Sequence, residues 1–343
     1  MVRAAIVGCG SIARLRHAPE YKNNENAVIA GFFDVDRKRA AEMSNSFGGR
    51  VYNNVEDILN DSLVDAVSIS AANSVHSLYA IASLRAGKHV LCEKPMATTL
   101  EDCDAMIEAS VAADRILMIG HNQRFVPAHI KAKEIIDSEI IGNVISFRTV
   151  FSHKGPETWA IDKSRGTWFF KKEIAGMGVT ADLGIHKVDL LRWLINDDFV
   201  EINASISTLD KKYSDGTAIQ VEDNAFCILK SVRGIMGTMT ASWTNYGEEE
   251  NSTVIYCTGG TIELFCDNDH QICVRTKEGN CSYFDSENIQ TNDRQTNSGV
   301  IDSFIGSIEK GTKPEVSGYD GRESVRVILA CCESAARRSV VRL

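Results

Sequence analysis

The stretch that decides the fold is Ala4-Ala5-Ile6-Val7-Gly8-Cys9-Gly10-Ser11-Ile12-Ala13, close to the start of the chain. Its first four residues predict a short buried strand, and the rest match the pattern G-x-G-x-x-A at the start of a predicted helix. In that setting Gly8 allows a tight turn, Gly10 lets the backbone approach a pyrophosphate, and Ala13 permits close packing of helix on strand. The stretch therefore predicts a dinucleotide-binding site at a helix N-terminus, and a plain strand–helix turn is the alternative.

Apolar runs and helical patterns then alternate as far as residue 122. After the first strand, further strands are predicted at 28–33, 64–69, 88–92 and 116–119, and helices at 37–47, 75–86 and 100–113. Short strands separated by such helices imply a parallel sheet that is covered on both faces, with right-handed crossovers. We therefore predict an α/β Rossmann domain over residues 1–122.

Beyond residue 122 the pattern becomes rich in strands. Strands are predicted at 144–151, 202–208, 225–231, 235–243, 252–257, 261–265 and 272–276, helices at 127–136, 180–195, 300–309 and 321–338, and a polar loop at 285–298. Turn residues such as Arg233-Gly234 and Gly259-Gly260 suggest antiparallel meanders. We predict an α+β domain over residues 123–343 with a large, mainly antiparallel open sheet, and we expect that the C-terminal helix can pack back on the first domain.

Composition and charge exclude several classes of protein. The 343 residues, 44% hydrophobic and 24% charged, are typical of a globular chain of two domains. The net charge of -9 argues against nucleic acid and anionic membranes as partners. No apolar run approaches the roughly 20 residues that span a bilayer, and glycine comes too early for a signal peptide. We therefore expect a cytoplasmic protein. The ten cysteines include no C-x-x-C pair and no metal-ligand spacing, so we predict buried thiols and no metal site.

Asp34 ends the predicted strand 28–33, where a carboxylate can hydrogen-bond both ribose hydroxyls of an adenosine. It would also repel the 2′-phosphate of NADP, so NAD is the expected cofactor. Arg37 lies close enough to receive that phosphate, which leaves NADP open. The alternative for Asp34 is an N-cap of the following helix.

A second set of polar residues lies at two distant points of the chain. Glu93-Lys94-Pro95 follows the strand 88–92, at the carboxyl edge of the sheet where open α/β sheets bind ligands. A lysine there is placed to reach the nicotinamide end of a cofactor. Asp182 and His186 are four residues apart on the predicted helix 180–195, and hence on one face.

Together these motifs resemble the Gfo/Idh/MocA family, which includes glucose–fructose oxidoreductase and inositol dehydrogenase. The resemblance is carried by Gly8 to Ala13, Asp34, Asn73-x-x-His76, Lys88 to Cys92, Glu93-Lys94-Pro95, Gly120 to Phe125 and Asp182-x-x-x-His186. It implies hydride transfer between a nicotinamide cofactor and a secondary alcohol or ketone of a sugar, inositol or related polyol. It also implies a homodimer or homotetramer that pairs through the C-terminal sheet.

The resemblance also implies roles for single residues. His186 would be the general base, Asp182 would orient its imidazole, and Lys94 would stabilise the developing alkoxide. Pro95 would follow a cis peptide bond. The implied cofactor contacts are Gly8, Gly10, Ser11, Ile12, Ala13, Asp34, Arg37, Ala71, Asn73, His76, Glu93, Lys94 and Asn122, and the implied substrate contacts are Lys94, Arg124, Trp168, Asp182 and His186.

Several of these assignments have structural alternatives. Asn73 and His76 also suit the start of a helix, Arg124 also suits a salt bridge between the domains, and Trp168 also suits a core. Phe169 stands where the family usually has Arg, which puts any cofactor contact there in doubt. A non-catalytic NAD(P)-binding regulator and a redox-neutral glycosidase are alternatives for the whole chain. The presence of both Lys94 and His186 argues against them.

Overall fold

The first of two β-sheets follows the predicted alternation. In the computed structural model, which describes residues 1–266, 269–285 and 297–343, six parallel strands lie in the order β3-β2-β1-β4-β5-β6. They are β1 (Val2–Val7), β2 (Ala27–Phe33), β3 (Arg50–Val51), β4 (Ala66–Ile69), β5 (His89–Cys92) and β6 (Leu117–Ile119). The predicted Rossmann domain is confirmed. Only β3 was not predicted, because two residues give no apolar run.

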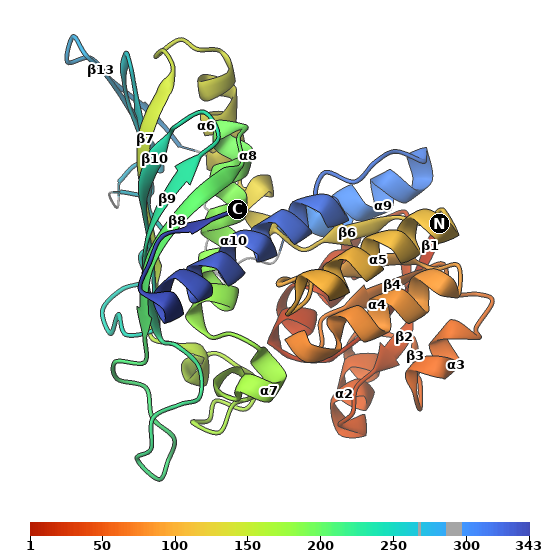
Figure 1. The fold of residues 1–343 in the computed structure, drawn as a ribbon. Helices are drawn as coiled ribbons and strands as arrows, with labels where there is room; N and C mark the ends of the chain where they lie inside the picture. Colours follow the sequence, from red (N-terminus) through yellow and green to blue (C-terminus); the bar gives the residue numbers. More distant parts are fainter. Residues whose placement is uncertain (267–268, 286–296) are drawn as a thin grey trace.

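Helices cover both faces of this sheet (Figure 1). The helices of the first 122 residues are α1 (Ala18–Asn23), α2 (Arg37–Phe47), α3 (Val55–Leu59), α4 (His76–Arg85) and α5 (Leu100–Ala113). Buried side chains of α3, α4 and α5 join one apolar cluster, and those of α1 and α2 join another. The strands are therefore buried on both sides, which leaves their carboxyl ends as the accessible edge.

The second sheet has nine strands in the order β14-β13-β12-β11-β7-β10-β9-β8-β15. They are β7 (Val144–Ser152), β8 (Phe199–Ser207), β9 (Asn224–Ser231), β10 (Met236–Ser242), β11 (Thr253–Cys257), β12 (Gly260–Leu264), β13 (Ile272–Thr276), β14 (Cys281–Phe284) and β15 (Val341–Arg342). The prediction of a large, mainly antiparallel sheet is confirmed. Its centre differs from a simple meander, because β10 returns beside β7 in parallel.

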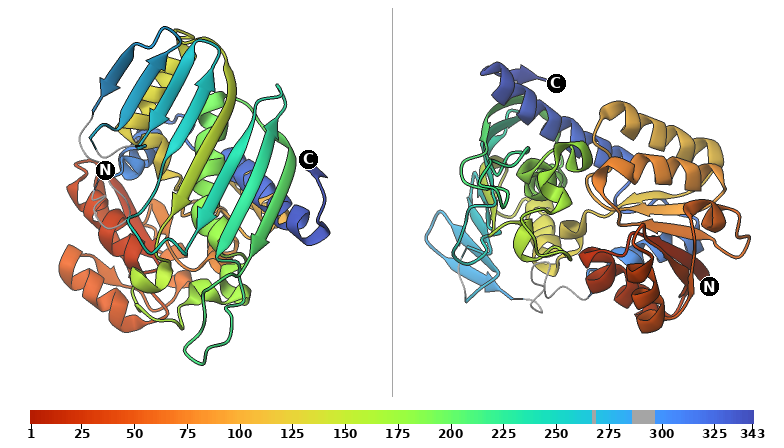
Figure 2. Two further views of the ribbon diagram at one scale, coloured as in Figure 1. Left: turned by 90° about the vertical axis from the view of Figure 1, so that its left-hand side faces the viewer. Right: turned by 90° about the horizontal axis from the view of Figure 1, so that it is seen from below.

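One face of the second sheet carries helices, while no helix among the described residues covers the other (Figure 2). The helices are α6 (Pro127–Asp137), α8 (Ile185–Ile195) and α10 (Gly318–Arg337), and the short α7 (Lys172–Ala175) lies near the first domain. No helix of the described residues is long and apolar enough to cross a membrane.

The C-terminal part of the chain packs on both sheets. Helix α9 (Val300–Lys310) buries Phe304 in the apolar cluster that contains Ile6 and Tyr21. The backbone oxygen of Val316 then accepts a hydrogen bond from the backbone nitrogen of Ile119, at 3.0 Å, and α10 crosses to β8. The division of the chain between residues 122 and 123 stays a prediction. Most of the predicted loop 285–298 lies outside the described residues.

Candidate active site

A cavity of about 480 Å³ lies along the carboxyl ends of the first sheet and is closed by segments of the second domain. Polar and small side chains of the first sheet form one wall, and the aromatic side chains of Trp159, Trp168 and Phe169 form part of the other. Twelve of the predicted site residues line it: Gly8, Gly10, Ser11, Ile12, Asp34, Ala71, Asn73, His76, Glu93, Lys94, Trp168 and Asp182. Ala13, Arg37, Asn122, Arg124 and His186 do not line it.

The glycine turn has the geometry of a pyrophosphate cradle. Gly8 has φ +92°, and a Cβ there would lie 2.6 Å from the backbone nitrogen of Ala71. At Gly10 a Cβ would meet nothing within 4 Å, so this glycine leaves space on the cavity side. Ala13 is completely buried in a π-helical turn (Ala13–His17) that leads into α1. The residues present therefore fit a dinucleotide.

Asp34 is held at the cavity by two backbone donors. Its Oδ2 accepts from the backbone nitrogen of Cys9 at 2.7 Å, and its Oδ1 accepts from that of Asp36 at 2.8 Å. The N-cap of α2 is Asp36, so the alternative role suggested for Asp34 falls to its neighbour. Both carboxylate oxygens of Asp34 keep lone pairs that can accept from ribose hydroxyls.

Arg39 lines the cavity in place of Arg37, which the sequence suggested. The guanidinium of Arg37 donates to Oδ1 of Asn53, and Arg37 does not line the cavity. Arg39 lines it and pairs with Asp36 at 3.4 Å. Arg39 was missed because the two arginines lie on one helix start, and nothing in the sequence says which of them turns inward.

Glu93 forms a buried ionic group below the cavity. Its Oε1 lies 3.1 Å from Nη2 of Arg16 and 3.0 Å from Nε2 of His17. Burial alone would raise the pKa of Glu93, but the charge of Arg16 and the hydrogen bond with His17 hold it well below its usual value. Glu93 therefore stands at the cavity as an anion that is already neutralised by protein groups.

Asn73 and His76 start a helix and line the cavity at the same time. The side-chain amide of Asn73 donates to the backbone oxygen of Ala175 at 2.9 Å, which ties the first domain to α7. The ring of His76 lies between the backbone oxygens of Pro95 and Ala71, at 2.8 and 3.0 Å. Both side chains fix the backbone around the cavity, while their predicted contacts with a cofactor stay predictions.

Lys94 and Asp182 meet across the two domains. The Lys94–Pro95 peptide bond is cis, and Nζ of Lys94 donates to Oδ1 of Asp182 at 3.0 Å and to its backbone oxygen at 2.8 Å. Asp182 lies in a π-helical turn (Thr180–Gly184) that leads into α8. Such turns are frequent at functional sites. The carboxylate of Glu222 accepts hydrogen bonds from the backbone nitrogens of Gly178 and Thr180, which stabilises the start of this helix.

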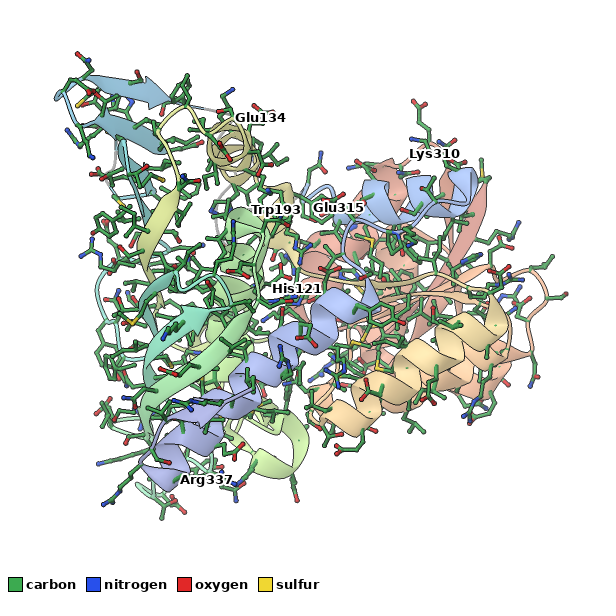
Figure 3. The ribbon with its side chains drawn as sticks, turned by 45° about the horizontal axis from the view of Figure 1, so that its top comes forward. His121, Glu134, Trp193, Lys310, Glu315 and Arg337 are labelled. Carbon is green, nitrogen blue, oxygen red and sulfur yellow. The ribbon has the colours of Figure 1, made fainter. Side chains whose placement is uncertain are left out.

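His186 is buried in the first turn of α8. No hydrogen bond joins it to Asp182 in the described structure, which differs from the expected orientation of the imidazole by Asp182. The reason is that the Asp182 carboxylate is occupied by Lys94 and by the indole nitrogen of Trp243. The ring of His186 instead contacts His121 edge-on, with centroids 6.4 Å apart, and Phe151 at 5.9 Å. Figure 3 shows His121 at the junction of the two domains.

The electrostatic surroundings keep His186 neutral. Burial lowers its pKa well below the ordinary 6.5, and the positive charge of Lys94 adds to the effect. An imidazole that is neutral at neutral pH can accept a proton, which is what a general base requires.

Two residues near Asp182 carry no motif and were missed in the sequence. Trp243, just after β10, donates from Nε1 to Oδ2 of Asp182 at 3.0 Å. His153, just after β7, has Nε2 4.0 Å from the same oxygen. Its Nδ1 accepts from the backbone nitrogen of Gly155 at 2.9 Å, so the neutral ring carries its proton on Nε2, toward Asp182. Only the fold brings these strand ends to Asp182.

Arg124 and Asn122 lie away from the cavity. The guanidinium of Arg124 binds both carboxylate oxygens of Asp189, at 2.6 and 2.8 Å, and Asp320 at 3.0 Å. This is a salt bridge, but it lies within the predicted second domain rather than between the domains, because the acidic partners come from α8 and α10. Asn122 begins a buried 3-10 turn beside it. Their predicted ligand contacts are not supported by these positions.

The aromatic wall belongs to the segment that precedes α7. Trp168 and Phe169 are stacked with ring centroids 3.9 Å apart, and Trp159 packs edge-on against Phe169 at 5.1 Å. The hydroxyl of Ser11 donates to the backbone oxygen of Trp159 at 3.2 Å, which joins this wall to the glycine turn. Trp168 thus lines the same cavity as the glycine turn and is not a residue of a separate core.

All ten cysteines are free thiols, and seven of them are buried, whereas Cys266 and Cys281 are exposed and Cys332 is half-buried. Within the described ranges, no group of three or more His, Cys, Asp or Glu side chains could hold a metal ion.

The fold and this site define an NAD-binding oxidoreductase of the Rossmann type with a second, sheet-based domain. A family model described as "Oxidoreductase family, NAD-binding Rossmann fold" matches residues 2–121, and one for the "GFO/IDH/MocA C-terminal domain" matches residues 129–263. The chain belongs to the Gfo/Idh/MocA oxidoreductase family.

Among the relatives of this chain are two full-length matches. Myo-inositol 2-dehydrogenase of Thermotoga maritima is 29% identical over 351 aligned positions, with 100% of this chain and 98% of the relative covered. The 1,5-anhydro-D-fructose reductase of Ensifer adhaerens is 28% identical, with 98% and 97% covered. Both names describe oxidoreductases of polyhydroxylated compounds.

Solved structures share the fold over the whole chain. Aldose-aldose oxidoreductase from Caulobacter crescentus, complexed with glycerol, superimposes with a TM-score of 0.85 at 26% identity and covers 100% of this chain and 99% of its own. Levoglucosan dehydrogenase, in complex with NADH and levoglucosan, gives a TM-score of 0.88 at 24% identity, with 100% and 99% covered. At that identity the second comparison supports the fold alone.

Proposed function

We propose that this chain is a dehydrogenase that transfers a hydride between NAD and a secondary alcohol of an inositol, a sugar or a related polyol. The observation that carries the proposal is the meeting of Lys94 with Asp182, 3.0 Å apart, at the end of the cavity that the glycine turn opens. Bound NAD would supply the hydride acceptor. The names of the full-length relatives support a polyhydroxylated substrate.

The chain's own residues would share the remaining work. Gly8, Gly10 and Asp34 would bind the dinucleotide. His186, kept neutral by burial, would take the proton of the substrate hydroxyl. Lys94 would donate to the same substrate oxygen and stabilise the negative charge that develops there. The half-buried aromatic wall would limit the access of water to the cofactor.

The test is a screen for NADH formation with the purified chain over inositols and aldoses. We expect turnover with at least one polyol and faster turnover with NAD than with NADP. The Lys94→Ala variant is the control for contaminating dehydrogenases, because it should lose the activity and keep the fold. Absence of NADH formation with all these polyols would contradict the proposal.

A further inference from the structure

We propose that Trp243 is a positioning residue of the reaction centre, whose indole N–H holds one carboxylate oxygen of Asp182 while the other oxygen faces Lys94. The inference rests on the proposed function, since it concerns the same site. It adds a residue that no sequence motif marks and that belongs to the second sheet rather than to the cavity wall.

Trp243 is fixed by its surroundings. It follows β10 directly, its backbone nitrogen donates to the backbone oxygen of Asp223 at 2.8 Å, and its side chain is completely buried. The ring packs against Phe170 with centroids 5.9 Å apart. The indole nitrogen is the only polar atom of the side chain, and a buried indole needs an acceptor. Here the acceptor is Oδ2 of Asp182, at 3.0 Å.

The two oxygens of Asp182 are therefore held from opposite sides. Oδ1 accepts from Lys94, which comes from the edge of the first sheet, and Oδ2 accepts from Trp243, which comes from the second sheet. The final torsion of an aspartate is soft, so one bond alone would leave the carboxylate free to turn. With both hydrogen bonds in place, the plane of the Asp182 carboxylate is fixed. The position of the Lys94 ammonium group, which is bonded to that carboxylate, is fixed as well.

A fixed carboxylate matters because Lys94 must donate to a substrate oxygen at a defined point. Catalytic groups lose efficiency when they are displaced by about 1 Å, even if every group is still present. Loss of the indole donor would let Asp182 draw Lys94 away from that point. We expect Trp243→Phe to lower kcat about tenfold or more, while the Kd for NAD and the KM for the polyol change less than threefold.

The decisive experiment is a double-mutant cycle with Asp182→Ala. If Trp243 acts through Asp182, Trp243→Phe lowers kcat in the wild-type background and has no further effect in the Asp182→Ala background. A merely structural role predicts the same loss in both backgrounds, and that result would overturn the proposal. Trp193→Phe is the matched control. Trp193, labelled in Figure 3, is in the last turn of α8, whereas Asp182 precedes the start of that helix, so the change should leave kcat unchanged.

Two further measurements keep the test decisive if Trp243→Phe folds poorly. Benzothienylalanine at position 243 keeps the shape of the ring but replaces the N–H by sulfur, and it should reproduce the loss of kcat without a loss of stability. In ¹⁵N-labelled protein, the indole N–H signal that disappears in Trp243→Phe should move when Asp182 is changed to Ala. An unmoved signal would overturn the Trp243–Asp182 bond. No turnover of any polyol by the wild-type chain would overturn the proposed function, and the positioning role with it.

Discussion

Lys94 Nζ donates to both the side chain and the backbone oxygen of Asp182, at 3.0 and 2.8 Å, and this pair joins the edge of the first sheet to the turn that leads into α8 in the second domain. The exposed fractions of the two side chains are 12% and 4%, so the ion pair is largely shielded from water. Such a pair is strong only where its geometry is supported by further hydrogen bonds. Here the further hydrogen bond comes from Trp243, which donates to the second oxygen of the Asp182 carboxylate. The geometry of the ion pair therefore depends on how the two domains are arranged.

The glycine turn gives a prediction with a matched control. Gly8→Ala should destabilise the protein, because the new Cβ would lie 2.6 Å from the backbone of Ala71 at a φ of +92°. Gly10→Ala should leave the stability of the free protein unchanged, since nothing lies within 4 Å, but it should weaken NAD binding by filling the cradle. Thermal melting with and without NAD separates the two effects. Equal melting temperatures for Gly8→Ala and wild type would contradict the packing argument.

Cofactor choice is expected to follow Asp34. NAD(H) should raise the melting temperature more than NADP(H) does, because the carboxylate can accept from ribose hydroxyls and repels a 2′-phosphate. Arg39→Ala should weaken whatever NADP binding remains, whereas Arg37→Ala should not, since the Arg37 side chain is bonded to Asn53 outside the cavity. Equal or greater stabilisation by NADP(H) in the wild-type chain would show that Arg39 outweighs the carboxylate.

Much of the fold was predictable because apolar runs and glycine turns are local signals. The predicted helices at 37–47 and 100–113 match α2 and α5, and β13 matches its predicted range. β14 was missed because its four residues are all exposed and lack a buried face, and β15 because it has only two residues. The parallel pairing of β7 with β10 depends on a long crossover that no local pattern records.

The sequence motifs of the candidate site could be recognised in advance, but the hydrogen-bond partners of its residues could not. Lys94, Asp182 and His186 were singled out by their positions in the predicted elements, and the resemblance to the family implied their roles. The first two lie together at the cavity. The partners of Asp182 could not be inferred, because Trp243 reaches it only through the register of the second sheet. Arg124 shows the same limit, since its three bonds to Asp189 and Asp320 depend on how α8 and α10 pack.

Buried histidines should make the protein less stable in mild acid. Burial lowers the pKa of His129 to about 3, against about 6.5 in the unfolded chain. The unfolded state therefore binds more protons below pH 6.5, and stability falls as the pH drops below that value. At about pH 5.5, one unit below the unfolded pKa, His129 alone should lower the free energy of unfolding by about 1.4 kcal/mol.

Urea unfolding at two pH values checks this expectation. The difference in unfolding free energy between about pH 7.5 and about pH 5.5 should shrink by about 1.4 kcal/mol in His129→Gln, because that variant removes the titrating group. His76, His121 and His186 have pKa values lowered mainly by burial and act with the same sign, so some difference should remain. An unchanged difference in His129→Gln would show that His129 is protonated in the folded state.

The uncovered face of the second sheet predicts self-association. Phe226 and Ile228 of β9, Met236 of β10 and Tyr256 of β11 point to this face with 49%, 46%, 51% and 38% of their surface exposed. An apolar sheet face without helical cover is expected to be buried in a partner. Light scattering at micromolar concentration should give the mass of a homodimer or homotetramer. Phe226→Glu with Ile228→Glu should give a monomer of unchanged fold; a wild-type monomer would refute the prediction.

The final prediction concerns Lys94 and His186, which we expect to act on one substrate oxygen. Each single change to Ala should lower turnover by at least roughly 10²-fold, the usual scale for a positioned acid–base or electrostatic group. NAD binding should survive His186→Ala, because His186 does not line the cavity that holds the glycine turn.

The double variant distinguishes joint from separate action. If both side chains act on the same oxygen, Lys94→Ala with His186→Ala should lose less than the product of the two single effects, since residues that act as a unit are not additive. The charge of Lys94 lowers the pKa of His186, so part of the coupling between the two residues is electrostatic. Because both side chains are largely buried, added salt should weaken this coupling only slightly. Near-wild-type turnover in His186→Ala would remove the proposed base, and strictly multiplicative losses would place the two residues in separate steps of the reaction.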